Sequence, residues 1–473
     1  MFQLVPLNIA GPSYLDRSRP LSSQRTVNFY HELNPSGKDK YVIKSFPGQK
    51  AFGSVGGGIE RGSHVCNGIL FRIKDNRLYE VSSDGTHTDR GVIIGDDRCT
   101  FADDGENLFI VVPSVKVYQY NIYSNALTEV TDTDITGAKS VTVLNNQFIY
   151  TFDRLSVLSD VGDGSSATSL NAVGAESQPD GIVRDYAFDQ VVYRFGTKTV
   201  ELWYNSGVGT PPFDRITGQL FNVGLLASHS VRNTREYVYW LGSDHQIYRA
   251  RGGQEEPIST PAITGIIEGL NTVADAYGDV IAIDNKYFYV LTFPSESRTF
   301  AVNEELGANG WFELSEGIGD NRFNAGSIVQ AYNKTYVCDF QDGHIRELDF
   351  STYTIGGDTW QRRRVISSIN GDLLGQKGQR VQMSRLELII ETGTGLISGQ
   401  GEDPRIMIEP SYDGGRTWAT GTWMKVGRLG QFDIRAEWYS LKSFYDMIVR
   451  ITVSDPVNFS IYSGSVELRL AGR

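Results

Sequence analysis

The side chains that most often carry catalysis or hold metals are few in this chain and lie far apart in its sequence. The histidines form no HxH or HExxH pair, and no GxxxxGK[ST] phosphate loop, GxGxxG fingerprint or GxSxG nucleophile turn occurs. Cys66, Cys99 and Cys338 have no CxxC spacing and are odd in number, which argues against a disulfide scaffold or a cysteine zinc site. We therefore expect no enzyme, no cofactor and no metal ion.

One short motif is specific. The segment Ser411–Trp418 reads SYDGGRTW and fits the Asp-box pattern S-x-D-x-G-x-T-W, which sialidases repeat on the blades of their propellers. In such a box the serine and aspartate side chains bond the backbone of their own turn, the glycines allow positive φ, and the tryptophan packs beneath. The pattern predicts a structural hairpin built on Ser411, Asp413, Gly415 and Trp418 rather than a reaction centre.

Basic residues are concentrated at one place, the run Arg362, Arg363 and Arg364. Three more basic residues follow within the next 21 positions, and only two acidic residues lie over the same stretch: Lys377, Arg380 and Arg385 against Asp372 and Glu387. A solvated face would explain such a run. It could also be a basic patch at an interface, either a salt-bridge zone between subunits or a surface that meets an acidic partner.

Composition narrows the function classes further. The 473 residues include 44 Lys and Arg against 56 Asp and Glu, a formal net charge of −12, which argues against a protein that grips nucleic acid through its phosphates. Glycine (51), tyrosine (24) and phenylalanine (23) are abundant, as expected for short strands joined by tight turns. No stretch approaches ~18 apolar residues, so we expect no membrane span.

The middle of the chain repeats one unit, an apolar strand, a polar turn and a second strand. Seven such hairpins begin near residues 70, 109, 148, 191, 237, 287 and 334, a recurrence of ~39–50 residues that is typical of β-propeller blades. The pattern predicts an all-β protein with a propeller of six or seven blades over residues 61–355. A β-sandwich or a meander of unrelated hairpins is the alternative. One short helix is expected near Thr264–Leu270.

The two ends of the chain differ from this repeat. Residues 1–60 contain five prolines and little periodicity, so they predict an extended N-terminal arm that runs over other structure or over another subunit. Residues 356–473 begin at a Gly356–Gly357 hinge and contain long alternating strands, for example Met383–Ile390 and Asp446–Val453. They predict a separate, antiparallel, sandwich-like platform domain at the C-terminus.

Several segments together resemble a known family. Gln24–Tyr30 (QRTVNFY), Ser45–Gly48 (SFPG), Ala175–Ile182 (AESQPDGI) and Trp423–Arg428 (WMKVGR) are similar to segments of the tail hub or nozzle proteins of short-tailed bacteriophages, also called packaged-DNA stabilisation proteins. The segments are short, but they span the chain from the arm to the C-terminal domain. A propeller attached to a second β-rich domain agrees with this resemblance.

The resemblance implies a mechanical role in a virion tail, for a protein made in the host cytoplasm. Six copies would form a tube below the portal and its head-to-tail adaptor, and double-stranded DNA would pass through the lumen without sequence-specific binding. The hub would retain the packaged genome, carry tailspikes or tail fibres, and meet a needle or plug at its tip. The family has no catalytic residues to transfer. The alternative, a sialidase-like or carbohydrate-binding propeller protein, predicts clustered arginines and carboxylates at the central mouth of the propeller.

Overall fold

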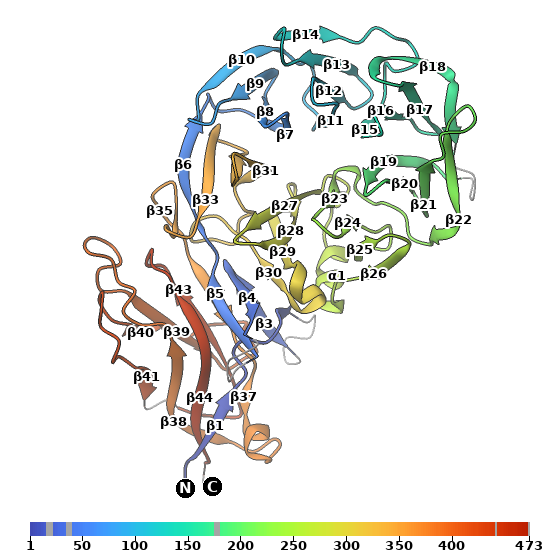
Figure 1. Cartoon of the computed structure of the whole chain (residues 1–473). Helices are drawn as coiled ribbons and strands as arrows, with labels where there is room; N and C mark the ends of the chain where they lie inside the picture. The colour runs from blue at the N-terminus through green and yellow to red at the C-terminus, as the bar shows by residue number, and fades with distance from the viewer. Residues whose placement is uncertain (16–21, 35–39, 175–179, 440–441, 472–473) are drawn as a thin grey trace.

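The computed structural model describes residues 1–15, 22–34, 40–174, 180–439 and 442–471. It contains a ring of small sheets and, beside the ring, a second β-rich domain in which both chain termini lie (Figure 1). The first five residues of the AESQPDGI segment, 175–179, lie outside the described residues. No helix among the described residues is long and apolar enough to cross a bilayer.

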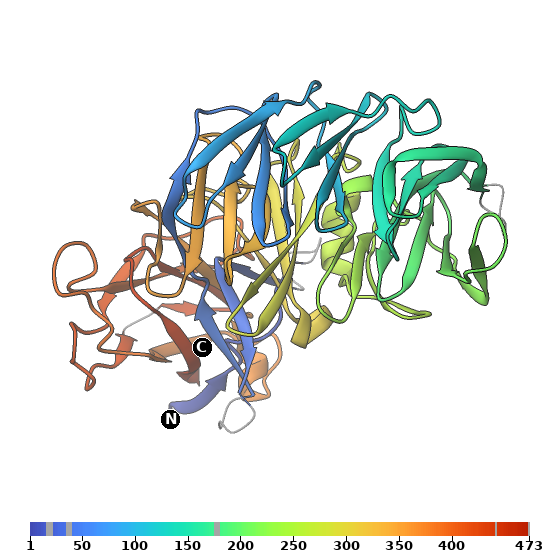
Figure 2. The same ribbon diagram turned by 45° about the horizontal axis from the view of Figure 1, so that its top comes forward.

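The ring is a β-propeller, as expected. Within the described residues it has seven blades of four antiparallel strands, each with its first strand innermost (Figures 1 and 2). The first four blades are β7 (Glu60–Cys66), β8 (Ile69–Lys74), β9 (Arg77–Val81) and β10 (His87–Val92); β11 (Thr100–Asp103), β12 (Asn107–Val112), β13 (Lys116–Asn121) and β14 (Ala126–Glu129); β15 (Ser140–Leu144), β16 (Gln147–Thr151), β17 (Leu155–Asp160) and β18 (Asp163–Gly174); and β19 (Ile182–Phe188), β20 (Val191–Gly196), β21 (Val200–Asn205) and β22 (Phe213–Phe221).

The last three blades connect the ring to the rest of the chain. They are β23 (Arg232–Asn233), β24 (Val238–Leu241), β25 (Ile247–Arg251) and β26 (Gln254–Pro257); β27 (Tyr277–Ile283), β28 (Lys286–Phe293), β29 (Arg298–Asn303) and β30 (Trp311–Glu313); and β31 (Ala325–Ala331), β32 (Lys334–Asp339), β33 (His344–Asp349) and β6 (Gly48–Ser54). In the last blade the short strands β34 (Thr354–Ile355) and β35 (Asp358–Thr359) extend the sheet beyond β6. The helix α1 (Pro261–Glu268) lies between β26 and β27, close to its predicted place. Its N-cap is Thr260, whose hydroxyl accepts a hydrogen bond from the Ile263 N–H.

The second and third strands of each blade carry the core. In β12 every residue from Leu108 to Val112 is buried, because both faces of these strands pack against neighbouring blades. The apolar clusters accordingly lie between blades: Phe109 and Phe148, for example, belong to adjacent blades and their ring centroids are 4.5 Å apart. These middle strands are the hairpins that the sequence predicts.

Ring closure uses strands from both ends of the propeller segment. The blade β31–β33 comes from the end of that segment, and β6, which directly precedes the first blade in sequence, pairs with β33 as its outer strand. The antiparallel register runs from His344 opposite Ser54 to Asp349 opposite Gly48. Because β6 leads directly into the first blade and is hydrogen-bonded to the last one, this pairing closes the ring between the first and last blades.

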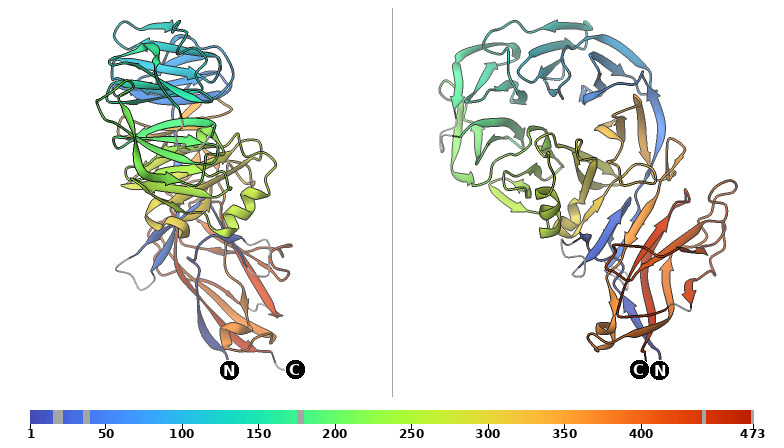
Figure 3. Two further views of the ribbon diagram at one scale, coloured as in Figure 1. Left: turned by 90° about the vertical axis from the view of Figure 1, so that its right-hand side faces the viewer. Right: turned by 180° about the vertical axis from the view of Figure 1, so that it is seen from behind.

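The second domain is a β-sandwich, also as expected (Figure 3). One sheet contains β4 (Phe29–Leu33), β5 (Tyr41–Ser45), β44 (Ser460–Leu470), β38 (Val381–Ile390) and β41 (Ala436–Tyr439), with β1 (Gln3–Leu7) on β44 and β42 (Ser443–Phe444) on β38. The other contains β36 (Arg362–Val365), β43 (Asp446–Val453), β39 (Arg405–Ser411) and β40 (Thr422–Lys425), with β37 (Ile369–Asn370) on β43. Their facing side chains, among them Met383, Ile408 and Leu468, form one apolar core.

A single strand joins the two domains. β3 (Ser23–Val27), to which the short β2 (Tyr14–Leu15) is added, pairs in parallel with β30 of the propeller and antiparallel with β36 of the sandwich. The sixth blade and one sandwich sheet are thus one continuous hydrogen-bonded sheet. The strands of residues 1–60 lie in sheets of both domains; the boundaries 1–60, 61–355 and 356–473 stay predictions.

Candidate functional site

The Asp-box segment forms the turn between β39 and β40. Asp413 accepts hydrogen bonds from the backbone N–H groups of Arg416 (3.0 Å) and Thr417 (2.9 and 3.0 Å), and the Ser411 hydroxyl accepts one from the Gly415 N–H (2.8 Å). Gly415 has a φ of +84°, which a residue with a Cβ rarely adopts. Hydrogen bonds from Thr417 hold the pKa of the Asp413 carboxyl well below its ordinary value. All these bonds stay within the turn, which is what a folding device requires.

Trp418, the last residue of the box, points back to the sheet beneath. It is half-buried, and the guanidinium carbon of Arg450 on β43 lies 4.5 Å from its ring centroid. Arg450 is also paired in bidentate fashion with Glu409 (2.7 Å for both bonds). The indole therefore covers an ion pair, an arrangement that adds a cation–π contact to the hairpin.

The arginine run lies at the domain junction, and its side chains alternate in direction. Arg362 and Arg364 are fully buried within the chain, which corrects the interpretation of these two residues as part of a surface patch. Arg363 is partly exposed, and its role at an interface stays a prediction. Each guanidinium is bonded by uncharged oxygens. The acceptors of Arg364 are Ile9 O (2.9 Å), Gly11 O (2.8 Å), Thr26 Oγ1 (2.8 Å) and Gln24 Oε1 (2.9 Å); those of Arg362 are Ser45 Oγ (2.8 Å), Val457 O (2.6 Å) and Asp455 O.

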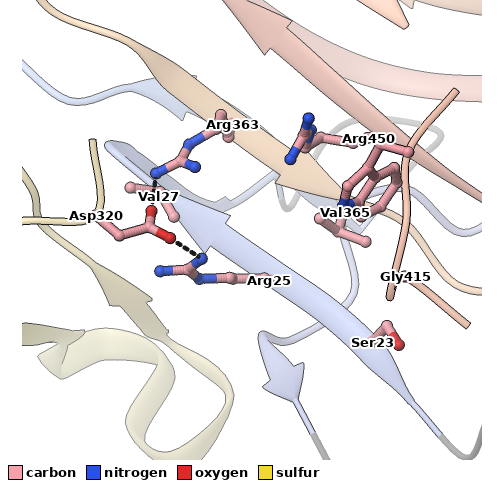
Figure 4. Close-up of a pocket in the computed structure, with 9 residues that line it drawn as sticks. Ser23, Arg25, Val27, Asp320, Arg363, Val365, Gly415 and Arg450 are labelled. Carbon is pink, nitrogen blue, oxygen red and sulfur yellow. Dashed lines mark hydrogen bonds and ion pairs between the residues drawn. The ribbon is translucent and has the colours of Figure 1, made fainter. Parts of the chain in front are cut away.

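Arg363, between them, faces a small cavity of about 220 Å³ between the propeller and the sandwich (Figure 4). Asp320 accepts from Arg25 on β3 (2.9 Å) and forms an ion pair with Arg363 on β36. Burial opposes ionisation of Asp320, but the two arginines outweigh it and lower its pKa to about 2. Arg25 is held on its other side by Glu313 of β30 (2.6 and 2.8 Å). The cavity is thus the centre of a charge network that binds the two domains to each other.

A second cavity, of about 350 Å³, lies at the centre of the propeller. It is lined from the innermost strands of several blades, and its polar lining includes Ser63, His64, Thr100, Asp103, Thr142, Arg184, Tyr186, Arg232 and Asn233. His64 Nε2 and Asp103 Oδ2 are 2.6 Å apart, and the His64 ring is stacked on Phe101. Burial raises the pKa of the Asp103 carboxyl, but the hydrogen bond and the charge of His64 outweigh burial, so this pKa is lowered. The pair joins two adjacent inner strands, β7 and β11.

Three arginines gather around this centre with one buried carboxylate. Asp279 on β27 lies 3.5 Å from both Arg98 and Arg232. Its pKa is raised, because burial outweighs the two arginines. Arg184 on β19 is 4% exposed and donates Nη1 to Ser228 O (2.9 Å), while its Nε has no partner among the residues that the structure describes. Burial, followed by the charges of Arg232 and Arg98, lowers the pKa of Arg184 to about 9.

Sequence reasoning missed these central arginines. They lie about 50–85 residues apart, one at the start of each of several inner strands, so no local pattern joins them. The repeat itself was the available signal, because equivalent positions of successive blades meet at the axis of the ring. Among the described residues no group of three or more His, Cys, Asp or Glu is arranged to hold a metal ion.

Two family models match the chain. The model described as bacteriophage P22 Gp10, beta-propeller, matches residues 3–353, and the model described as bacteriophage P22 Gp10, beta-sandwich, matches residues 367–469. The tail hub protein gp10 of Salmonella phage P22 is 21% identical over 340 residues, which cover 67% of this chain and 70% of the relative. Among solved structures, the computationally designed Ika8 protein has a TM-score of 0.38 and 11% identity, covering 63% of this chain and 99% of its own. A TM-score this low carries no argument.

Proposed function

We propose, from the premise that the chain belongs to the bacteriophage P22 Gp10 tail hub family and has a structural role in a phage tail, that six copies of it form a hub. This hub continues the DNA channel below the portal and its adaptor. The hub retains the packaged double-stranded DNA, carries tailspikes or tail fibres, and holds a needle or plug at its tip. Its role is mechanical and not enzymatic.

The observation that carries the proposal is the family match over both domains in order, 3–353 and 367–469. The structure supports a load-bearing role, because β3 makes the sixth blade and a sandwich sheet continuous. The charge network of Arg25, Glu313 and Asp320, which Arg363 joins from β36, crosses the same junction, and the buried Arg364 ties residues 9–26 to β36. A subunit built this way would transmit force between its domains with little bending.

Net charge supports the proposed passage of DNA. A protein of net charge −12 repels phosphates overall, and six copies would multiply that charge around a lumen. A wall of this kind offers DNA few adhesive sites, so retention would come from a closed exit and ejection would meet little resistance. Tight binding to the DNA backbone would slow ejection and make it strongly salt-dependent.

Assembly on adaptor-bearing heads tests the proposal. The purified chain is mixed with DNA-filled, tailless heads that carry the adaptor, and with heads that lack it, and both are imaged by negative stain while the mass of the added particle is measured. We expect a ring of six copies on the adaptor-bearing heads. A chain that stays monomeric there, or forms trimers, contradicts the proposal. Removing residues 1–30 would be a poor control, because β1, β3 and part of β4 pair within this chain.

A further inference from the structure

We propose that the cavity at the propeller centre binds the oxyanion of a small ligand, a carboxylate or phosphate group, on Arg184 and Arg232. This goes beyond the proposed hub role, which needs no ligand in the ring. The cavity, of about 350 Å³, is in the size range of small-molecule sites.

The first argument is the uncompensated charge of Arg184. Arg184 is 4% exposed, and among the described residues it forms no ion pair with any carboxylate. A guanidinium has five N–H donors, yet within the described part of the chain Arg184 donates one hydrogen bond, from Nη1 to Ser228 O, and its buried Nε has no partner. A buried charge without a counterion is costly, and an oxyanion in the cavity would supply the opposite charge and accept hydrogen bonds from the guanidinium N–H groups that face it.

A second buried arginine of the same blade is, in contrast to Arg184, paired with a carboxylate. Arg194, on β20, is also 4% exposed, but its Nε lies 2.9 Å from Asp185 Oδ1 and its Nη1 donates to Gly174 O. The blade therefore provides a carboxylate for one buried arginine and not for the other. The arginine without a carboxylate is the one that lines the cavity.

The neighbours of Arg184 add to the positive charge. Arg98 and Arg232 both lie 3.5 Å from Asp279, which is the carboxylate that these three guanidinium groups have as an ion-pair partner among the described residues. Arg184 and Arg232 line this cavity, whereas Arg98 lines a neighbouring one. The cavity's own acidic side chain, Asp103, is engaged by His64 and makes no ion pair with Arg184. The cavity thus has an excess of positive charge, although the net charge of the whole protein is −12.

The rest of the lining suits a polar ligand. Ser63, Thr100 and Thr142 carry hydroxyl groups, and the stacked His64 and Phe101 rings offer a flat face. A ligand anchored by one oxyanion could thus bring hydroxyl groups and a ring, as an acidic sugar or a sugar phosphate does. The structure shows no pair of carboxylates placed here as acid and nucleophile, so the inference concerns binding.

Calorimetry and thermal unfolding of the full chain test the inference with three probes. N-acetylneuraminate carries a carboxylate, inorganic phosphate carries no sugar, and N-acetylglucosamine is a neutral control. We expect saturable binding of at least one of the two anions, a raised Tm in its presence, and no effect of the neutral sugar at about 10 mM, where a millimolar site is mostly filled. If only phosphate or only the carboxylate binds, the result identifies which of the two oxyanions the site accepts. Binding of neither overturns the inference.

Two matched variants locate the site. Arg184→Gln keeps a donor for Ser228 O but removes the charge, and we expect anion affinity to fall on the order of 10- to 100-fold. Arg235→Gln removes the same charge from an exposed position outside the cavity and should bind as the unchanged chain does. Wild-type affinity in Arg184→Gln overturns the proposal.

Stability of the unliganded chain separates binding from a structural role. Because Arg184 is buried without a counterion, Arg184→Gln should leave the Tm unchanged or raise it in the absence of anions. A lowered Tm with anion binding intact would mean that Arg184 is structural, and the inference would be wrong. If Arg184→Gln does not fold, Arg184→Lys keeps the charge without the planar fork and is expected to bind more weakly than the unchanged chain but to follow the same anion selectivity. Unaltered affinity in that variant would equally count against the site.

Discussion

Arg364→Lys should weaken the junction between the propeller and the sandwich far more than its conservative chemistry suggests. The buried guanidinium of Arg364 spreads four hydrogen bonds over two backbone carbonyls, a hydroxyl and an amide oxygen. All four acceptors lie in residues 9–26, so this one side chain ties the N-terminal strands to β36. A lysine keeps the charge but donates from a single nitrogen and cannot reach all four.

The magnitude follows from the bonds lost. If lysine satisfies two of the acceptors, two charge-assisted hydrogen bonds disappear, each worth about 1.5–3 kcal/mol, for a loss of about 3–6 kcal/mol in the free energy of unfolding. With about 2.1 cal/mol/K of unfolding entropy per residue, the 473 residues give about 1 kcal/mol/K, so the Tm should fall by about 3–6 °C if the chain unfolds as one unit.

The matched control is the same substitution one residue earlier. Arg363 pairs with Asp320, whose side chain is half exposed, so Arg363→Lys should cost about 1 kcal/mol or less. Urea and thermal unfolding of both variants, followed by circular dichroism, make the comparison. Equal stability of the two variants would refute the reasoning, since it would mean that the four acceptors of Arg364 find other partners at little cost.

Three other substitutions test the remaining interactions. Because the pKa of Asp320 is about 2 when folded and 3.8 is its ordinary value, its ion pairs should stabilise the chain above pH ~4 and lose effect as the pH falls toward 2, so the Tm of Asp320→Asn should change less over that interval than that of the unchanged chain. Asp413→Ala should open the Asp-box turn, which limited proteolysis would detect as faster cleavage between β39 and β40, with the propeller unaffected. Glu60→Gln leaves the fully buried Arg72 without its carboxylate and should cost about 3–5 kcal/mol in urea unfolding, whereas a cost below about 1 kcal/mol would show that water reaches the pair.

The sequence predicts the middle strands of the blades well and the inner and outer ones poorly. The second strands, such as β8 and β32, are almost wholly buried and appear as apolar runs, whereas β9 and β33, which follow after one turn, mix buried and partly exposed residues. The innermost strands are more polar or very short, such as β23 with two residues, so hydrophobic periodicity does not detect them. The seven hairpins leave six or seven blades open; in the structure each blade contributes one of these hairpins as its middle strands.

The long-range pairing of the N-terminal strands could not be predicted. Residues 23–27 read SQRTV, with one apolar residue and no alternation, and nothing in them indicates that they bridge β30 and β36, some 290 and 340 residues away. The same limit explains the arginine run. Three adjacent arginines usually indicate exposure, but here the alternation of β36 turns Arg362 and Arg364 inward, toward carbonyl groups that come from distant segments.

The way a buried guanidinium is satisfied distinguishes structural arginines from binding ones in this protein. Arg364 has no carboxylate, yet it uses four acceptors, and its removal would leave those acceptors unpaired. Arg184 also pairs with no carboxylate of the described residues; its one hydrogen-bond acceptor among them is a carbonyl, and a cavity lies beside it. The stability of the chain should therefore respond oppositely to the two substitutions. Replacing Arg364 leaves four buried acceptors unpaired, whereas replacing Arg184 removes a buried charge that an added anion would otherwise neutralise.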